Sequence, residues 1–160
     1  MLSFKKYYKL LKKTDEPSVL IGQIQEAVSH AASLSRYFWP PINKKSNEAI
    51  QDLRNFRAKQ LRGDFRLADT SALTNRDLRN EFDHFEEKLD IYLLSTDSGY
   101  FFPTPIIGSH QLADDPISRI FKLLDVKTEC LVLLNKKFFF QPIYEEVEKI
   151  YYIAIENSIH

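Results

Sequence analysis

The sequence predicts an all-α fold, a helical bundle of four to five main helices with one small β-hairpin near the C-terminal helix. Apolar residues recur at helical spacing in several long segments, and prolines or glycines mark many of the segment ends. Only residues 128–140 contain short β-rich runs on either side of turn residues. The chain has the length of one ordinary domain and shows no linker, so we expect a single helical domain over residues 1–160.

Two helices are expected in the N-terminal part. Residues 2–13 form a short basic amphipathic pattern whose aromatic side chains share one side. Residues 17–38 carry a longer apolar stripe, in which the small residues Ala27 and Ala31 would let another helix approach closely. Pro40 and the proline after it should end this helix, because a proline disfavours helical geometry at the residue before it.

A third helix is expected over residues 46–62, with Ser46 as its N-cap and Gly63 as its C-terminal stop. This segment is basic, and Arg54 and Arg57 are among its cations. A charge run of this kind forms either a solvated face or a set of contacts to a phosphate backbone. Both interpretations stay open from the sequence.

The fourth helix is the best specified, over residues 74–94. Thr74 followed by Asp77 is a capping-box pattern that marks its start. An apolar stripe roughly 80° wide follows from the period of about 100° per residue; it consists of Leu78, Phe82, Phe85, Leu89 and Tyr92. We expect the first four of these to be buried. Asn80 and His84 lie on the other side with Glu87, so they should face a cleft or an interface.

The C-terminal half should be more irregular. Residues 95–116 hold two glycines and three prolines, and their aromatic run Tyr100–Phe102 should pack over the bundle. Residues 116–124 are expected to form a short helix, and residues 128–140 a hairpin that lies against the helices. A last helix should run over residues 141–157.

Composition limits the classes of function. The formal net charge is zero, which argues against a protein that coats DNA non-specifically. Cys130 is the only cysteine, so neither a disulfide framework nor a thiol cluster for zinc is available. No secretory signal and no bilayer-spanning run is visible, and we expect a cytoplasmic protein with no membrane contact. No phosphate-binding glycine loop, metal motif or cofactor motif is present, so we expect neither a metal nor a cofactor.

One group of residues in the fourth helix carries recognisable chemistry. Arg79 is followed directly by the polar Asn80 and, after four intervening residues, by His84. This pattern resembles the motif of HEPN-domain ribonucleases, which are small helical bundles. The longer string RNEFDHFEEKLD is also similar to the version in many small prokaryotic members of that family.

The residue types suit the cleavage of RNA without a metal. A histidine can move a proton near neutral pH, and His84 would do so. A guanidinium offers a planar fork of donors for charge that develops on a phosphate, and Arg79 would supply it. Asn80 could orient either the phosphate or the histidine. With these three as catalytic residues, Arg54, Arg57 and Arg76 are the candidates for RNA binding.

The resemblance also implies how such a site works and assembles. It implies attack by the RNA 2′-hydroxyl, a 2′,3′-cyclic phosphate product and a homodimer that joins two motifs across a two-fold axis. It further implies a defence or toxin–antitoxin setting with a protein antitoxin as partner. Arg79 and His84 would point about 140° apart on one straight helix, so a second copy or a neighbouring helix would have to complete the site.

Two other classes of function remain open from the sequence. Arg79 and Asp83 are spaced for a surface ion pair worth about 0.3–0.5 kcal/mol, and the charged face could be only that. The chain would then be a non-catalytic helical interaction module, for example a neutralising partner. The other class is a bundle that binds a small ligand, with Tyr100–Phe102 lining an apolar pocket.

Overall fold

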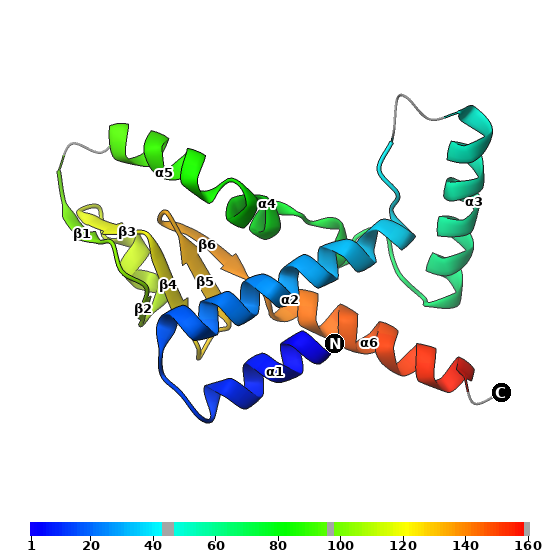
Figure 1. Cartoon of the computed structure of the whole chain (residues 1–160), viewed down its shortest axis with the longest axis horizontal. Coiled ribbons are helices and arrows are strands. Elements are labelled where there is room, and N and C mark those ends of the chain that lie inside the picture. The colour runs from blue at the N-terminus through cyan, green and yellow to red at the C-terminus, as the bar shows by residue number, and fades with distance from the viewer. Residues whose placement is uncertain (43–46, 96–97, 159–160) are drawn as a thin grey trace.

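The computed structural model describes residues 1–42, 47–95 and 98–158. Within these ranges the chain has a mixed α/β fold, in which helices pack around two small sheets (Figure 1). The helices are α1 (Leu2–Leu11), α2 (Pro17–Phe38), α3 (Glu48–Asp64), α4 (Asp77–Asp83), α5 (Phe85–Leu94) and α6 (Gln141–Ser158), with two short 3-10 turns, η1 (Ala72–Thr74) and η2 (His110–Asp114). The strands are β1 (Tyr100–Phe102), β2 (Ile106–Ile107), β3 (Ser118–Ile120), β4 (Lys122–Asp125), β5 (Cys130–Leu133) and β6 (Lys136–Phe139). The prediction of an all-α bundle with a single hairpin was therefore wrong.

The helical frame follows the sequence pattern closely. The long helix α2 runs through the middle of the molecule and α1 packs along it, while α3 stands at the end of α2 away from the sheets (Figure 1). Pro17 occupies the first turn of α2, where its missing N–H costs no hydrogen bond. The start of α3 is capped by Asn47, whose side-chain oxygen accepts a hydrogen bond from the Ala49 N–H at 2.9 Å. The predicted cap Ser46 lies outside the described residues, and the predicted stop Gly63 lies inside the helix.

The sheets replace the predicted short helix at residues 116–124. That segment instead forms β3 and β4, which pair in parallel with β1 and β2, respectively. The larger sheet has the order β2-β4-β5-β6, so β4 also pairs antiparallel with β5. A short apolar run reads equally well as helix or strand from periodicity alone. The partner strands, distant in sequence, decide the outcome here.

The predicted hairpin within residues 128–140 is confirmed, with a two-residue turn at Leu134 and Asn135. Both residues have positive φ, 49° and 61°, as a tight hairpin turn requires. The Asn135 side-chain oxygen accepts hydrogen bonds from the Ile120 N–H at 2.7 Å and from the Tyr92 hydroxyl at 2.8 Å. The turn of the hairpin is thus hydrogen-bonded to both β3 and α5.

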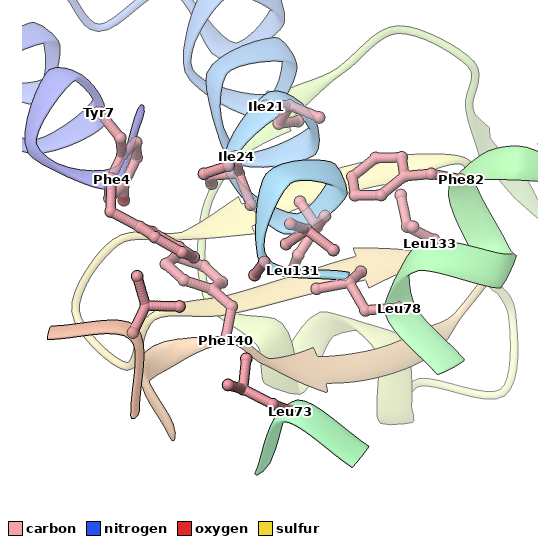
Figure 2. Close-up of a cluster of buried hydrophobic side chains, with 14 of the residues drawn as sticks. Phe4, Tyr7, Ile21, Ile24, Leu73, Leu78, Phe82, Leu131, Leu133 and Phe140 are labelled. Carbon is pink, nitrogen blue, oxygen red and sulfur yellow. The ribbon is translucent and has the colours of Figure 1, made fainter. Parts of the chain in front are cut away.

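The main core lies where α1, α2, α4 and β5 meet. Figure 2 shows buried side chains that converge from these elements, from η1 and from the residue before α6, namely Phe4, Tyr7, Ile21, Ile24, Leu73, Leu78, Phe82, Leu131, Leu133 and Phe140. Helix α3 contributes little to it, because only Ala58 of that helix is buried. The apolar residues Leu53 and Phe56 of α3 remain 67% and 63% exposed. Across the described residues, no helix is both long and apolar enough to cross a bilayer.

Candidate functional site

The predicted fourth helix is broken at His84, which separates α4 from α5. His84 has φ −114° and ψ 24°, values that depart from helical geometry. Helix α4 packs against α2, whereas α5 follows the edge of the sheets. There the Tyr92 ring lies edge-on to Phe121, with 6.2 Å between ring centroids. These two packing surfaces favour a bent segment over a straight helix.

The first turn of this segment also differs from the prediction. Thr74 belongs to the separate turn η1, so the predicted capping box does not form. The side-chain oxygen of Asn75 instead accepts a hydrogen bond from the Asp77 N–H at 2.7 Å. The helix therefore begins later than predicted, with a different polar side chain satisfying its first free N–H group.

The predicted burial is confirmed for most of the apolar stripe. Leu78, Phe82 and Phe85 are 4%, 7% and 8% exposed, respectively. Leu89 is only half-buried, because α5 diverges from the core after the break. The helical register of the motif is thus as expected from Leu78 to Phe85.

His84 lies exposed at the break, with one ring nitrogen engaged. Its Nδ1 lies 3.2 Å from Oε2 of Glu87, and its side chain is 55% exposed. A carboxylate beside Nδ1 favours the tautomer with the proton on that nitrogen. Nε2 is then the nitrogen that can exchange a proton with a bound molecule.

Arg79 has a carboxylate partner of its own. Its Nη2 lies 2.9 Å from Oδ2 of Asp83, and both side chains are partly exposed. The cavity that Arg79 lines has a volume of about 10 Å³, which is room for a single water molecule at most. Asn80 is exposed, and its carbonyl accepts a hydrogen bond from the His84 N–H at 3.1 Å. Arg79, Asn80 and His84 thus share one surface segment, but no described side-chain hydrogen bond or ion pair joins Arg79 to His84.

The three predicted RNA contacts lie on different elements. Arg76 precedes α4 and donates a hydrogen bond to the Trp39 carbonyl at 3.3 Å. Arg57 on α3 lies over the Tyr37 ring, 5.9 Å from its centroid. Arg54 is half-buried on the same helix, which stands apart from α4 and α5 in Figure 1. A role for these arginines in RNA binding stays a prediction.

A buried acid beside the motif was not anticipated from the sequence. Glu81 is 3% exposed, and its carboxylate contacts Lys88 Nζ at 2.6 Å and Lys136 Nζ at 3.4 Å. Lys122 lies close by, with Nζ 4.2 Å from the centre of the Phe85 ring. The spacing of Glu81 and Lys88 is visible in the sequence, but nothing there indicates Lys136 or Lys122. We name Lys88, Lys122 and Lys136 the lysine cluster.

Replacing Lys88 by methionine should destabilise the fold by about 1–3 kcal/mol, because it leaves the buried Glu81 carboxylate short of its nearer partner. The matched change Lys136→Met should cost less, about 0.2–1 kcal/mol, since that amine is 62% exposed and lies farther away. Urea denaturation of the two variants gives the comparison. Equal losses would contradict the unequal roles assigned to the two lysines.

A second polar cluster lies at the end of the sheet, away from the motif. Oδ2 of Asp125 accepts hydrogen bonds from the His110 backbone N–H at 3.0 Å and from its ring Nδ1 at 2.7 Å. Oδ1 accepts from the backbone N–H groups of Lys127 and Thr128 at 3.0 and 3.3 Å. Burial opposes ionisation of Asp125, but the hydrogen bonds from His110 and Thr128 outweigh it and hold the pKa of this carboxyl well below its usual range. Sequence reasoning missed the pair because its members are far apart in the chain.

This arrangement predicts a pH-dependent loss of stability. The folded pKa of Asp125 lies below its unfolded value of about 3.9, so its stabilisation is complete above that value and disappears as the pH falls through the folded pKa. Asp125→Asn should therefore cost about 1–3 kcal/mol at pH 7. The difference between variant and wild type should shrink below about pH 4. Urea denaturation from pH 7 to pH 3 measures it, with the exposed Asp15→Asn as control; a difference independent of pH would contradict the assignment.

The residues Tyr100–Phe102, for which the sequence predicts the lining of an apolar pocket, lie largely at the surface. They make up β1, in which Tyr100 and Phe101 are 69% and 42% exposed. The described residues contain no group of three or more histidine, cysteine, aspartate or glutamate side chains placed to hold a metal ion together.

Comparison of the chain with protein-family models, with curated proteins and with solved structures gives no match.

Proposed function

We propose that this chain is a metal-independent endoribonuclease that cleaves RNA by attack of a 2′-hydroxyl, with His84, Arg79 and Asn80 as its catalytic residues. The observation that carries the proposal is the state of His84. Its ring is exposed at a helix break and is held by Glu87 through Nδ1, which leaves Nε2 for proton transfer. The resemblance of the motif to HEPN ribonucleases supports the same assignment.

The chemistry balances with the residues named. The 2′-oxygen attacks phosphorus and loses its proton to a base, the bond from phosphorus to the 5′-oxygen breaks, and that oxygen gains a proton. The products are a 2′,3′-cyclic phosphate and a 5′-hydroxyl. His84 Nε2 would carry one of the two protons, and Arg79 would stabilise the charge on the phosphate once its pairing with Asp83 is exchanged for the substrate.

The lysine cluster would contact the phosphates of the RNA backbone. It carries three positive charges against the single buried carboxylate of Glu81, and it adjoins Phe85, the residue after His84. Lys88 and Lys136 are paired with Glu81, and Lys122 has no described ion pair, so Lys122 is the amine that would contact a phosphate.

The same geometry predicts a homodimer. Arg79 is paired with Asp83 and does not contact His84, so one copy of the motif does not form a closed site. A second copy placed across a two-fold axis near the α4–α5 break would supply the missing cation or histidine. Light scattering at about tens of micromolar should report twice the mass of the chain; a monomer throughout would count against the shared site.

The proposal is tested by incubating the purified chain with end-labelled single-stranded RNAs of varied sequence in the presence of EDTA. We expect cleavage that EDTA does not reduce, with fragments that end in a cyclic phosphate. The setting, defence or a toxin–antitoxin pair in the cytoplasm with an antitoxin protein as partner, is part of the proposal and rests on the resemblance alone.

A second candidate function is a non-catalytic interaction module. The exposed apolar residues of α3 favour it, since Ile50, Leu53 and Phe56 are 48%, 67% and 63% exposed on one helix. Absence of cleavage by the wild type across the varied RNAs would place this candidate ahead.

A further inference from the structure

The second polar cluster borders a cavity at the carboxyl ends of two parallel strands. β2 and β4 pair in parallel, with Ile107 opposite Leu124, so both strands end at the same edge of the sheet. The segments that follow them, residues 107–111 and 125–128, enclose a cavity of about 360 Å³.

The orientation of His110 determines which of its ring nitrogens can bind a ligand in this cavity. Asp125 is ionised and buried, and its Oδ2 accepts a hydrogen bond from the Nδ1–H of His110. Phe139 packs against the imidazole, with 5.5 Å between ring centroids. Nδ1 is therefore occupied, the ring is fixed, and Nε2 is the atom that can bind a ligand. Carboxylates orient histidines in functional sites through contacts of this kind. The same contacts would also stabilise the fold without any ligand, and we call that alternative a structural clasp.

The donors around the cavity outnumber the free acceptors. Lys127 contributes an amine with no described ion pair, and Asp125 is already saturated by four hydrogen bonds. The hydroxyl of Thr128 lies 3.1 Å from His110 Nδ1, and the Ser109 oxygen accepts from the Gln111 N–H at 3.3 Å. The Ser109 hydroxyl proton therefore remains to be donated, whereas the Thr128 hydroxyl is engaged with Asp125. The cavity thus presents the Lys127 amine, the Ser109 hydroxyl and His110 Nε2, which donates when the imidazole carries both protons, and this set of donors suits an anion.

We propose that this cavity binds the phosphate group of a small phosphomonoester, through His110 Nε2, Lys127 and the hydroxyl of Ser109. Three donors match the three terminal oxygens of a phosphate better than the two oxygens of a carboxylate. The apolar side chains of Ile107 and Val126 on the cavity wall would contact the organic part of the ester. This site is separate from the His84 motif, and it stands or falls independently of RNA cleavage.

The test is a titration of the full chain, followed by NMR of the histidine ring nitrogens. The chain has four histidines, so the His110 signals can be assigned by substitution. Inorganic phosphate, glycerol 3-phosphate and acetate serve as probes. We expect a saturable shift of the His110 Nε2 signal with both phosphates, tighter binding of the ester than of inorganic phosphate, and weaker binding of acetate. His84 should not shift in parallel.

Lys127→Met is the informative variant, because it keeps the contacts of the His110 ring with Asp125. Lys127→Met should weaken binding of glycerol 3-phosphate by about tenfold, the loss of one charge-assisted hydrogen bond, whereas the remote Lys9→Met should leave it unchanged. A shift that does not saturate, or equal affinity in Lys127→Met and wild type, would overturn the proposal. The pair would then be a structural clasp only.

Discussion

Replacement of His84 by alanine is expected to lower the rate of RNA cleavage by about 10²–10⁴-fold, the usual contribution of general acid–base catalysis. The fold should remain intact, because the side chain is 55% exposed and its described partner Glu87 lies on the surface. Single-turnover cleavage of a labelled RNA measures the rate, and urea denaturation checks the fold. Unchanged cleavage in the variant would assign the activity to other residues.

Arg79 provides the matching test on the cationic side of the site. Arg79→Ala should lose activity comparably, and Arg79→Lys should not fully restore it, because an ammonium lacks the planar fork of donors. The control is Asp83→Asn, which frees Arg79 from its ion pair and should not reduce cleavage to the same extent. Full activity in Arg79→Ala would remove arginine from the proposed mechanism.

Replacement of Phe140 by alanine is expected to destabilise the protein by about 3–5 kcal/mol, the typical cost of emptying a large aromatic site in a core. Phe140 is fully buried between β6 and α6, and its ring meets Tyr7 of α1 edge-on at 5.7 Å. The loss would be a large part of the stability of a typical domain, about 5–15 kcal/mol. Urea denaturation gives the value from the shift of the midpoint.

The neighbouring Phe139 is the matched control for this change. It has the same side chain one position earlier, but it is 52% exposed. Phe139→Ala should therefore cost much less than Phe140→Ala. Similar losses for both would contradict the strand register that turns one phenylalanine inward and the next outward.

The helices were largely predictable because their signals are local. The stripe and the prolines around α2 were sufficient to place it over residues 17–38, and the hairpin at residues 128–140 was visible from its two apolar runs. Helix α3 was placed approximately, yet its apolar residues Leu53 and Phe56 are exposed. Periodicity shows that a face is apolar, but not whether another element covers it.

The parallel strands could not be predicted, because their pairing is a long-range event. β1 and β2 are only three and two residues long, and each pairs with a strand that lies more than a dozen positions away. Segments this short show no hydrophobic periodicity from which a strand could be predicted. Residues 116–124 were therefore assigned to a short helix, although pairing with β1 and β2 makes them two strands.

The candidate site was predictable as a set of residues but not as a geometry. The spacing of Arg79, Asn80 and His84 is visible in the sequence. The apolar pattern also predicts the helical register of Leu78 and Phe82. The break at His84 depends on two packing surfaces that only the folded chain defines. The ion pair of the buried Glu81 with Lys136 joins distant parts of the chain, which no local pattern indicates.

The most direct test of the central claim compares two RNAs of one sequence, the first with ordinary ribose and the second with 2′-O-methyl ribose throughout. Both are incubated with the wild-type chain in EDTA, and the fragments are analysed for their 3′ ends. The account predicts cleavage of the ribose strand alone, with 2′,3′-cyclic phosphate ends, since only that strand carries the attacking hydroxyl. Cleavage of the methylated strand, or of neither strand, would contradict it.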